Sequence, residues 1–272
     1  MSSVETAPAP VVNLTWIPFW SLFKKEILRF WRVIAQTLLI PLVNSTLYLL
    51  IFGVSLGNSI EVGNEHSYIA FLIPGLIMMG VLNNAFQNSS SSIATSKFHG
   101  DLEDLRTVPL TRLQIVMAMS LAGMVRGFVV GLVTYTVGQV FFYFTQGTWL
   151  VIAHPLALIF FLCIGGYAFS ALGIAIGFSS KSIDQLSAVG GFILLPLLYL
   201  GGVFFPLSKL HPFWQDLSKV NPMLYFINGV RYGVLGHTDI DPGVCVAYAL
   251  VSTGLAFWLG MRAVKYGPYQ RW

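Results

Sequence analysis

Six long apolar segments are the feature that most constrains the fold of this chain. They lie at about residues 34–56, 67–89, 113–144, 155–178, 186–204 and 243–264. Each is near or above the ~20 residues that a helix needs to cross a bilayer. The composition agrees, because only 10% of the residues are charged, whereas soluble domains carry about 25%. We therefore predict an all-α polytopic membrane protein with six transmembrane helices, forming one domain over residues 1–272 with a six-span core at 34–264.

Basic residues are distributed unevenly between the predicted loops. With an inside N-terminus, eleven of the fifteen lysines and arginines fall in the inner segments, three fall in the outer segments, and Arg126 lies in the third span. Cytoplasmic loops carry an excess of lysine and arginine. The distribution predicts that both termini are cytoplasmic, as is the loop between the second and third spans.

That loop, the stretch 97–112 (KFHGDLEDLRTVPLTR), is rich in charge. Leu102, Leu105 and Val108 recur every third residue, which places them on roughly one face of a short helix. Acidic residues early in this helix suit its N-terminal dipole, and Pro109 ends it. We predict a rigid cytoplasmic helix with an apolar stripe that docks into a soluble partner. The residues assigned to this contact are Gly100, Asp101, Leu102, Glu103, Asp104, Leu105, Arg106 and Pro109.

Residues 14–33 combine aromatic and basic side chains before the first span. Trp20, Phe23, Ile27, Phe30 and Trp31 gather on one side of a helix, and the basic residues fall mostly elsewhere. This pattern predicts an amphipathic helix lying on the membrane surface. A soluble helix packed on a partner is the alternative.

Residues 201–242 are too apolar for a free loop and too broken by proline to span the membrane. We predict short interfacial or re-entrant helices in the outer leaflet, over about 204–235. Two interpretations are equally open: an aromatic belt that anchors the sixth span, and an outer gate. The gate residues would be Phe204, Phe205, Pro206, Phe213 and Trp214.

The inner half of the second span is unusually polar. Amide side chains facing lipid would lack hydrogen-bond partners, so they should face another helix, a partner protomer or a water-filled cavity. We predict a substrate pathway lined by Asn83, Asn84, Gln87, Asn88, Asn44 and Tyr199. Simple hydrogen bonding between helices is the alternative.

The third span is longer than a bilayer requires. Its residues 113–144 would reach ~48 Å against ~30 Å of hydrocarbon, so it is either strongly tilted or extended into the cytoplasm as a stalk. Counting back about 20 residues from Phe144 places the inner boundary near Val125. Arg126 then either snorkels to the headgroup edge or forms an ion pair or polar clamp to the second span.

Motifs for catalysis are missing from the sequence. It contains no G-x-x-x-x-G-K-[ST] loop for ATP phosphates and no H-E-x-x-H zinc motif. The two cysteines lie in apolar runs, which favours neither a disulfide framework nor a metal site. A net charge of +4 is too modest to indicate nucleic-acid binding. We therefore expect neither an enzyme nor a chain that binds a cofactor or metal of its own.

Taken together, the amphipathic N-terminal helix, the six spans, the GDLEDL…VPLTR loop and the GGVFFPLSKLHPFW…NPMLY segment resemble the ABC-2 type permeases. Within that family, the chain is most similar to the bacterial inner-membrane permeases of the YadH and NodJ kind. The resemblance covers about residues 14–265. It implies a homodimer in which each permease pairs with a separate ATPase subunit, which binds ATP and Mg. It also implies that 100–109 is the coupling helix, 14–33 the connecting helix, and 204–235 the extracellular re-entrant region.

The resulting hypothesis is a permease subunit of an ATP-driven exporter in a bacterial inner membrane. The substrate would be an amphipathic, lipid-like, glycan or drug-like molecule, since few charges are embedded in the spans. Two alternatives are an ATP-independent channel or carrier and a membrane scaffold that transports nothing. A channel or carrier would need a filter or embedded acids, and no Asp or Glu falls inside a predicted span.

Overall fold

The computed structural model describes residues 16–55 and 67–270, and these ranges contain helices and no strand. Six helical segments are long and apolar enough to cross a membrane, which confirms the predicted fold class. They are α2 with the π-helical turn η1 (Ile34–Tyr48 and Leu49–Ser55), α3 (Tyr68–His99), α5 (Arg112–Gln146), α6 (Pro155–Ser179), the fifth span (Ile183–Leu200) and α11 (Pro242–Tyr266). The fifth span comprises α7 (Ile183–Val189), the π-helical turn η2 (Gly190–Leu194) and α8 (Leu195–Leu200).

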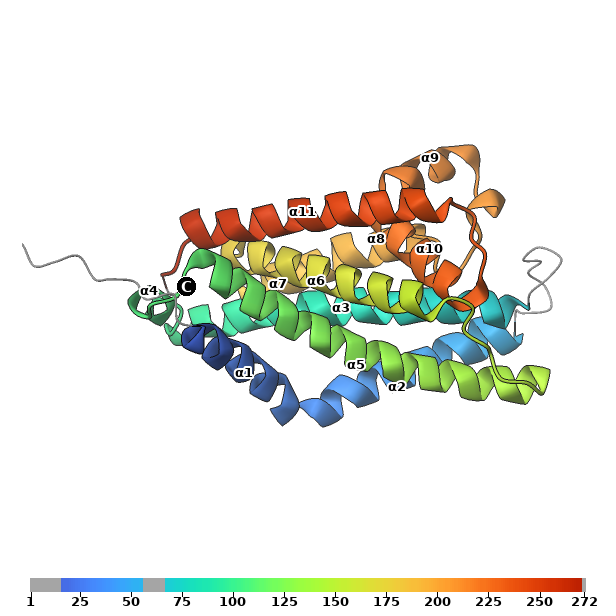
Figure 1. The fold of residues 1–272 in the computed structure, drawn as a ribbon, viewed down its shortest axis with the longest axis horizontal. Helices are drawn as coiled ribbons and strands as arrows, with labels where there is room; N and C mark the ends of the chain where they lie inside the picture. The colour runs from blue at the N-terminus through green and yellow to red at the C-terminus, as the bar shows by residue number, and fades with distance from the viewer. Residues whose placement is uncertain (1–15, 56–66, 271–272) are drawn as a thin grey trace, which may run out of the picture.

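Helix α3 forms the centre of the bundle. It packs along both α5 and α6, and α11 covers the other side of α6. These long helices run along the longest axis of the molecule (Figure 1). The short helix α1 (Ile17–Arg32) meets α2 at an angle and leans on α5, and the C-terminus lies at the same end as the short helix α4 (Asp104–Thr107). Both α3 and α5 exceed the length needed for one crossing, so the two form a long paired hairpin.

Close contact between α3 and α6 depends on glycine. A Cβ atom added to Gly173 would lie 2.5 Å from the carbonyl oxygen of Phe86 on α3, and one added to Gly177 would lie 3.1 Å from Ile93 Cβ. Small residues allow helix backbones to approach closely in membranes. Gly173 and Gly177, both in the predicted fourth span, therefore mark the surface of α6 on which α3 lies.

We expect Gly173→Ala to destabilise the protein by about 1–3 kcal/mol, because the added methyl group forces two packed backbones apart. The measurement is the apparent unfolding temperature of the purified chain. Gly254→Ala on α11 is the matched control, since a Cβ there meets no atom within 4 Å. Equal stability of the two variants would show that α3 and α6 do not pack this closely.

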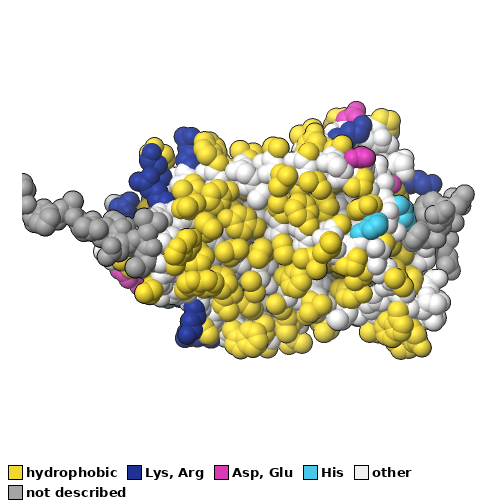
Figure 2. Space-filling model, in the orientation of Figure 1, with side chains coloured by type: hydrophobic (Ala, Val, Ile, Leu, Met, Phe, Trp, Pro, Cys, Tyr) yellow, Lys and Arg dark blue, Asp and Glu magenta, His cyan; other side chains and the backbone are white. Residues whose placement is uncertain are grey.

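Apolar side chains cover the middle of the molecular surface, and charged side chains gather at its two ends (Figure 2). The least buried of the six segments are α2, the fifth span and α11, and each exposes large apolar side chains. Such a band, flanked by charge, is what a bilayer-spanning protein presents to lipid.

The stretch 97–112 differs from its predicted form. Helix α3 continues through its serine run to His99, and Gly100 ends it with a φ of +88°, in the left-handed region that glycine tolerates. Between the end of α3 at His99 and the start of α5 at Arg112, only Asp104–Thr107 is α-helical, preceded by hydrogen-bonded turns. The predicted helix over 100–109 was therefore too long, because residues 101–103 form turns and the helix ends at Thr107. We call residues 100–111, which join α3 to α5, the elbow.

The outer region contains the 3₁₀ turn η3 (Leu207–Lys209), α9 (Pro212–Val220) and α10 (Pro222–Leu235). Helix α10 is largely buried and packs on α6, α11 and α3, whereas α9 exposes Phe213 and Trp214. Buried Arg231 holds α10 in place: its guanidinium donates to the Gly202 carbonyl at 2.8 Å and lies 3.8 Å above the Phe71 ring. Helices that do not span are thus confirmed between the fifth and sixth spans.

Candidate functional site: a polar cavity and the elbow

A cavity of about 720 Å³ lies between α2, α3, α5 and the first turns of the fifth span. Four of the six residues predicted to form a pathway line it: Asn44, Asn83, Asn84 and Gln87. The amides are partly satisfied within α3, where Asn84 donates to the Gly80 carbonyl and Gln87 donates to Asn83. The structure therefore brings most of the predicted polar residues to one hollow.

Two predicted pathway residues lie elsewhere. Asn88 is fully buried and faces α1 rather than the cavity. Tyr199 on α8 is not a lining residue, but its hydroxyl lies 3.5 Å from that of Tyr48, which lines the cavity. The reason for Asn88 is helical geometry, because it projects from α3 toward α1 while Gln87 faces the hollow.

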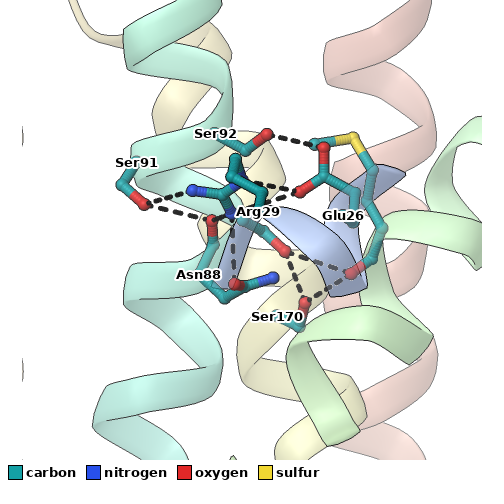
Figure 3. Close-up of polar contacts among 8 residues, drawn as sticks. Glu26, Arg29, Asn88, Ser91, Ser92 and Ser170 are labelled. Carbon is teal, nitrogen blue, oxygen red and sulfur yellow. Dashed lines mark hydrogen bonds and ion pairs between the residues drawn. The ribbon is translucent and has the colours of Figure 1, made fainter. Parts of the chain in front are cut away.

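A charged network joins α1 to α3 beside the cavity (Figure 3). Arg29 donates to the Glu26 carboxylate at 3.1 Å and to the Asn88 backbone carbonyl at 2.6 Å. The other Glu26 oxygen accepts a hydrogen bond of 2.8 Å from Ser92. Glu26 is 2% exposed, and a buried carboxylate is tolerable only when it is paired and hydrogen-bonded in this way.

This network corrects the predicted faces of the N-terminal helix. Trp20 and Trp31 are 60% and 62% exposed, while Phe30, placed on the same side, is 2% exposed. The buried side of α1 consists of Phe19, Leu22, Glu26 and Phe30. The charge at Glu26 lies on this inner side because its partners, Arg29 and Ser92, are there.

Ser89 and Ser170 tie the same level of α3 to α5 and α6. Their hydroxyls lie 2.5 Å apart, and the Met119 carbonyl oxygen of α5 lies 3.3 Å and 3.2 Å from them, so one hydroxyl donates to that carbonyl and accepts from the other. Figure 3 shows Ser170 in the same view as the Glu26–Arg29 pair. Part of the serine run therefore serves hydrogen bonding between helices, the alternative that the sequence had left open.

Arg126 on α5 is the second basic residue that lines the cavity, together with Arg29. Its Nε is buried and without a hydrogen-bond partner in the described residues. Neither ion pair found among those residues involves Arg126. The predicted ion pair from Arg126 to the second span is therefore absent from the described part of the chain, and its guanidinium faces the hollow.

The elbow is anchored by its own apolar side chain. Leu102, assigned to the partner contact, is 1% exposed and packs within a cluster that includes Phe19, Ile115 and Phe178. Leu105 is half-buried against the same cluster, and Val108 is exposed. Leu102 is thus not a contact surface in this structure, because the part of the apolar stripe formed by Leu102 and Leu105 faces the bundle. The exposed residues are Asp101, Glu103, Asp104, Arg106 and Pro109.

Lys97 fixes the end of α3 to the end of α6. It is fully buried, and its Nζ donates to the carbonyls of Gly177, Phe178 and Ser180 at 3.3, 2.5 and 3.1 Å. A cation at a helix C-terminus satisfies the last carbonyls and complements the helix dipole. Sequence reasoning had treated Lys97 as a loop charge.

The C-terminal segment also contacts the elbow. The Arg106 guanidinium lies 4.2 Å above the Tyr269 ring, and the Tyr269 hydroxyl donates to the Val264 carbonyl at 2.7 Å. Burial raises the pKa of Tyr269, and the nearby Arg106 and Arg112 partly oppose the shift. Tyr269 therefore stays neutral at physiological pH and serves as a packing surface. On the other side, a capping box between Thr111 and Gln114 begins α5.

The five predicted gate residues do not form one group. Phe204 is buried and contacts Tyr48, Phe52 and Tyr199 through ring centroids 4.8–5.4 Å apart. Pro206 is buried as well, Phe205 is exposed, and Phe213 and Trp214 contact each other on α9. The aromatic cluster around Phe204 contacts the C-terminal end of α2 at Tyr48, and a gating role for it stays a prediction.

Comparison with known proteins decides what kind of protein carries this arrangement. Residues 18–235 match the sequence profile of the ABC-2 type transporter. The chain belongs to the ABC-2 type transporter family. It is 39% identical over 249 residues to inner membrane transport permease YadH of Escherichia coli (strain K12), which covers 92% of this chain and 94% of that protein.

More distant relatives agree. Nodulation protein J of Neorhizobium galegae is 25% identical over 248 residues, covering 89% of both chains. Nodulation protein J of Rhizobium leguminosarum bv. viciae is 26% identical over 268 residues, covering 92% of this chain and 96% of the relative. The resemblance predicted from the sequence is thus confirmed. The chain is a multi-pass inner-membrane protein and a transport permease subunit.

Proposed function

We propose that this chain is the membrane subunit of an ATP-driven exporter. It would act as a homodimer with two copies of a separate ATPase that binds ATP and Mg. The observation that carries this proposal is the structure of the elbow. Its acidic side chains Asp101, Glu103 and Asp104 are exposed, while Leu102 in the elbow and Lys97 just before it are buried and hold the segment against the bundle. A surface that is charged outside and rigidly anchored inside suits force transmission from a soluble partner.

The route from the elbow to the cavity runs through α3 and α5. These two helices carry the elbow at one end, and their residues Asn83, Gln87 and Arg126 line the cavity further along. A push on the elbow would therefore move two walls of the hollow together. The polar lining and the apolar band around it suit an amphipathic substrate, such as a lipid-like, glycan or drug-like molecule.

The proposed orientation places both termini and the elbow in the cytoplasm, as the distribution of basic residues favours. Two features support it. The C-terminus and α4 lie at the same end of the molecule (Figure 1), and the Tyr269 ring contacts Arg106 of the elbow. An ATPase in the cytoplasm would then reach both.

The direct test is purification of the tagged full-length chain from its native membrane, followed by reconstitution in liposomes. We expect a separate ATPase polypeptide to co-purify, and ATP to drive export of an amphipathic substrate. Transport without ATP or a partner would instead support a channel or carrier. A co-purified ATPase whose activity no substrate stimulates would favour a scaffold.

A further inference from the structure

We propose that the cavity between α2, α3 and α5 binds an amphiphile with an anionic headgroup, phosphate or carboxylate, between Arg126 and Arg29. The inference rests on the proposed function, because it names the class of substrate that the permease would carry. It depends on three properties of the cavity lining: an unmatched positive charge, amide and hydroxyl groups, and apolar side chains.

Arg126 is the source of the unmatched positive charge. Its guanidinium lines the cavity, has no hydrogen bond to any described residue, and has no carboxylate of those residues within 4.0 Å. A guanidinium presents five donors in a planar fork that suits carboxylate and phosphate. Leaving a largely buried cation without a partner is costly, so a ligand that supplies an anion gains that unused interaction.

Arg29 brings a second guanidinium to the cavity, and Glu26 offsets most of its charge. One acid faces it, Glu26, and that carboxylate is already used by Arg29 and Ser92. Arg29 and Arg126 line the same cavity, so the pair Glu26–Arg29 is close to neutral and Arg126 leaves a net positive charge. No aspartate or glutamate is among the lining residues. A cationic headgroup would therefore meet repulsion from Arg126 and find no counter-charge, whereas an anionic one would be attracted.

The rest of the lining determines the remainder of the ligand. Asn83 and Gln87 provide amides next to the arginines, suited to ester, glycerol or sugar oxygens. Ile40, Leu76, Leu186 and Leu195 provide an apolar wall from four different elements, α2, α3, α7 and α8. A cavity of about 720 Å³ is within the range of small-molecule sites. An acidic group attached to a hydrocarbon chain fits both halves of this lining.

Binding can be measured on the full-length chain without any ATPase, using native mass spectrometry in a polyoxyethylene detergent. The probe is dodecyl phosphate, and dodecyltrimethylammonium, inorganic phosphate and phosphatidylglycerol are compared with it. We expect one tight dodecyl phosphate site, weakened roughly tenfold or more in Arg126→Gln and less in Arg126→Lys, because the lysine retains the charge but not the planar fork. Arg32→Gln is the matched control, since Arg32 is exposed and outside the cavity lining.

Each outcome bears on the proposal. Equal binding by Arg126→Gln and Arg32→Gln, or equal affinity for the cationic amphiphile, would overturn it. If inorganic phosphate binds as tightly as dodecyl phosphate, the proposal that the ligand is an amphiphile is overturned, and the cavity is a simple anion site. Tight, Arg126-dependent binding of phosphatidylglycerol would support it and assign the headgroup to a bilayer lipid. Because no ATP is present, failure here is distinguishable from failure of the ATPase partnership.

Discussion

Replacing Lys97 with methionine is expected to lower the apparent unfolding temperature by roughly 6–12 °C. The substitution keeps most of the side-chain volume but removes three charge-assisted hydrogen bonds to the carbonyls at the end of α6. Those carbonyls stay buried in the variant, so the cost is that of unsatisfied acceptors, about 3 kcal/mol in total. In a chain of this size each kcal/mol corresponds to roughly 2–4 °C.

The measurement is thermal unfolding of the purified chain in detergent. Unfolding is monitored as the loss of the monodisperse peak in size-exclusion chromatography after heating. Lys181→Met is the matched control, because Lys181 follows the same end of α6 but is exposed. We expect that control to behave as the wild type. If both variants unfold at the wild-type temperature, Lys97 is not the buried cap described above.

The membrane-spanning architecture was predictable from the sequence because hydrocarbon imposes a simple rule. A segment such as 155–178 is too long and too apolar to be anything but a buried helix, and the structure places α6 at Pro155–Ser179. The ends of the membrane-spanning helices were less predictable from the sequence. Ser92 and Lys97 lie beyond the predicted second span, yet α3 continues through both, since α1 and α6 supply their hydrogen-bond partners.

The cavity was predictable only in part, for a related reason. The amide spacing on α3 placed Asn83 and Gln87 on one face, and both line the hollow. Nothing in the spacing revealed that Glu26 and Arg29, fifty or more residues earlier, would meet Asn88 and Ser92. A lone acid on the inner side of an otherwise apolar and basic helix was the available signal. Such an acid requires a buried partner, and the sequence alone does not say which.

The elbow illustrates how tertiary contacts redirect a sequence pattern. The three-residue spacing of Leu102, Leu105 and Val108 indicated one apolar face, which was predicted to dock into a soluble partner. In the structure Leu102 packs inward, so the face available for docking is the acidic side that carries Glu103 and Asp104. Substitution of Leu102 would therefore test folding rather than docking. Docking is tested by substituting the exposed acidic residues Glu103 and Asp104.

Reversing both charges, Glu103→Arg with Asp104→Arg, is expected to abolish co-purification of the ATPase and ATP-driven transport while leaving the chain folded. Both carboxylates are exposed and make no ion pair in the described residues, so their replacement should cost little stability. Like charges placed across an interface cost several kcal/mol, which corresponds to an affinity loss of a hundredfold or more.

The readouts are the amount of ATPase retained on the tagged chain and the unfolding temperature of the chain alone. Asp184→Arg is the matched control: it is an exposed acid at the start of α7, next to the end of α6 that Lys97 caps, and thus at the same end of the molecule as the elbow. Loss of the ATPase in the double variant but not in the control would localise docking to the elbow. Equal retention in both would place the contact elsewhere, and equal loss in both would reduce the effect to general charge at this end. Because Leu102, Lys97 and Tyr269 hold the elbow from beneath in every variant, the comparison isolates the outward-facing carboxylates as the groups that the partner recognises.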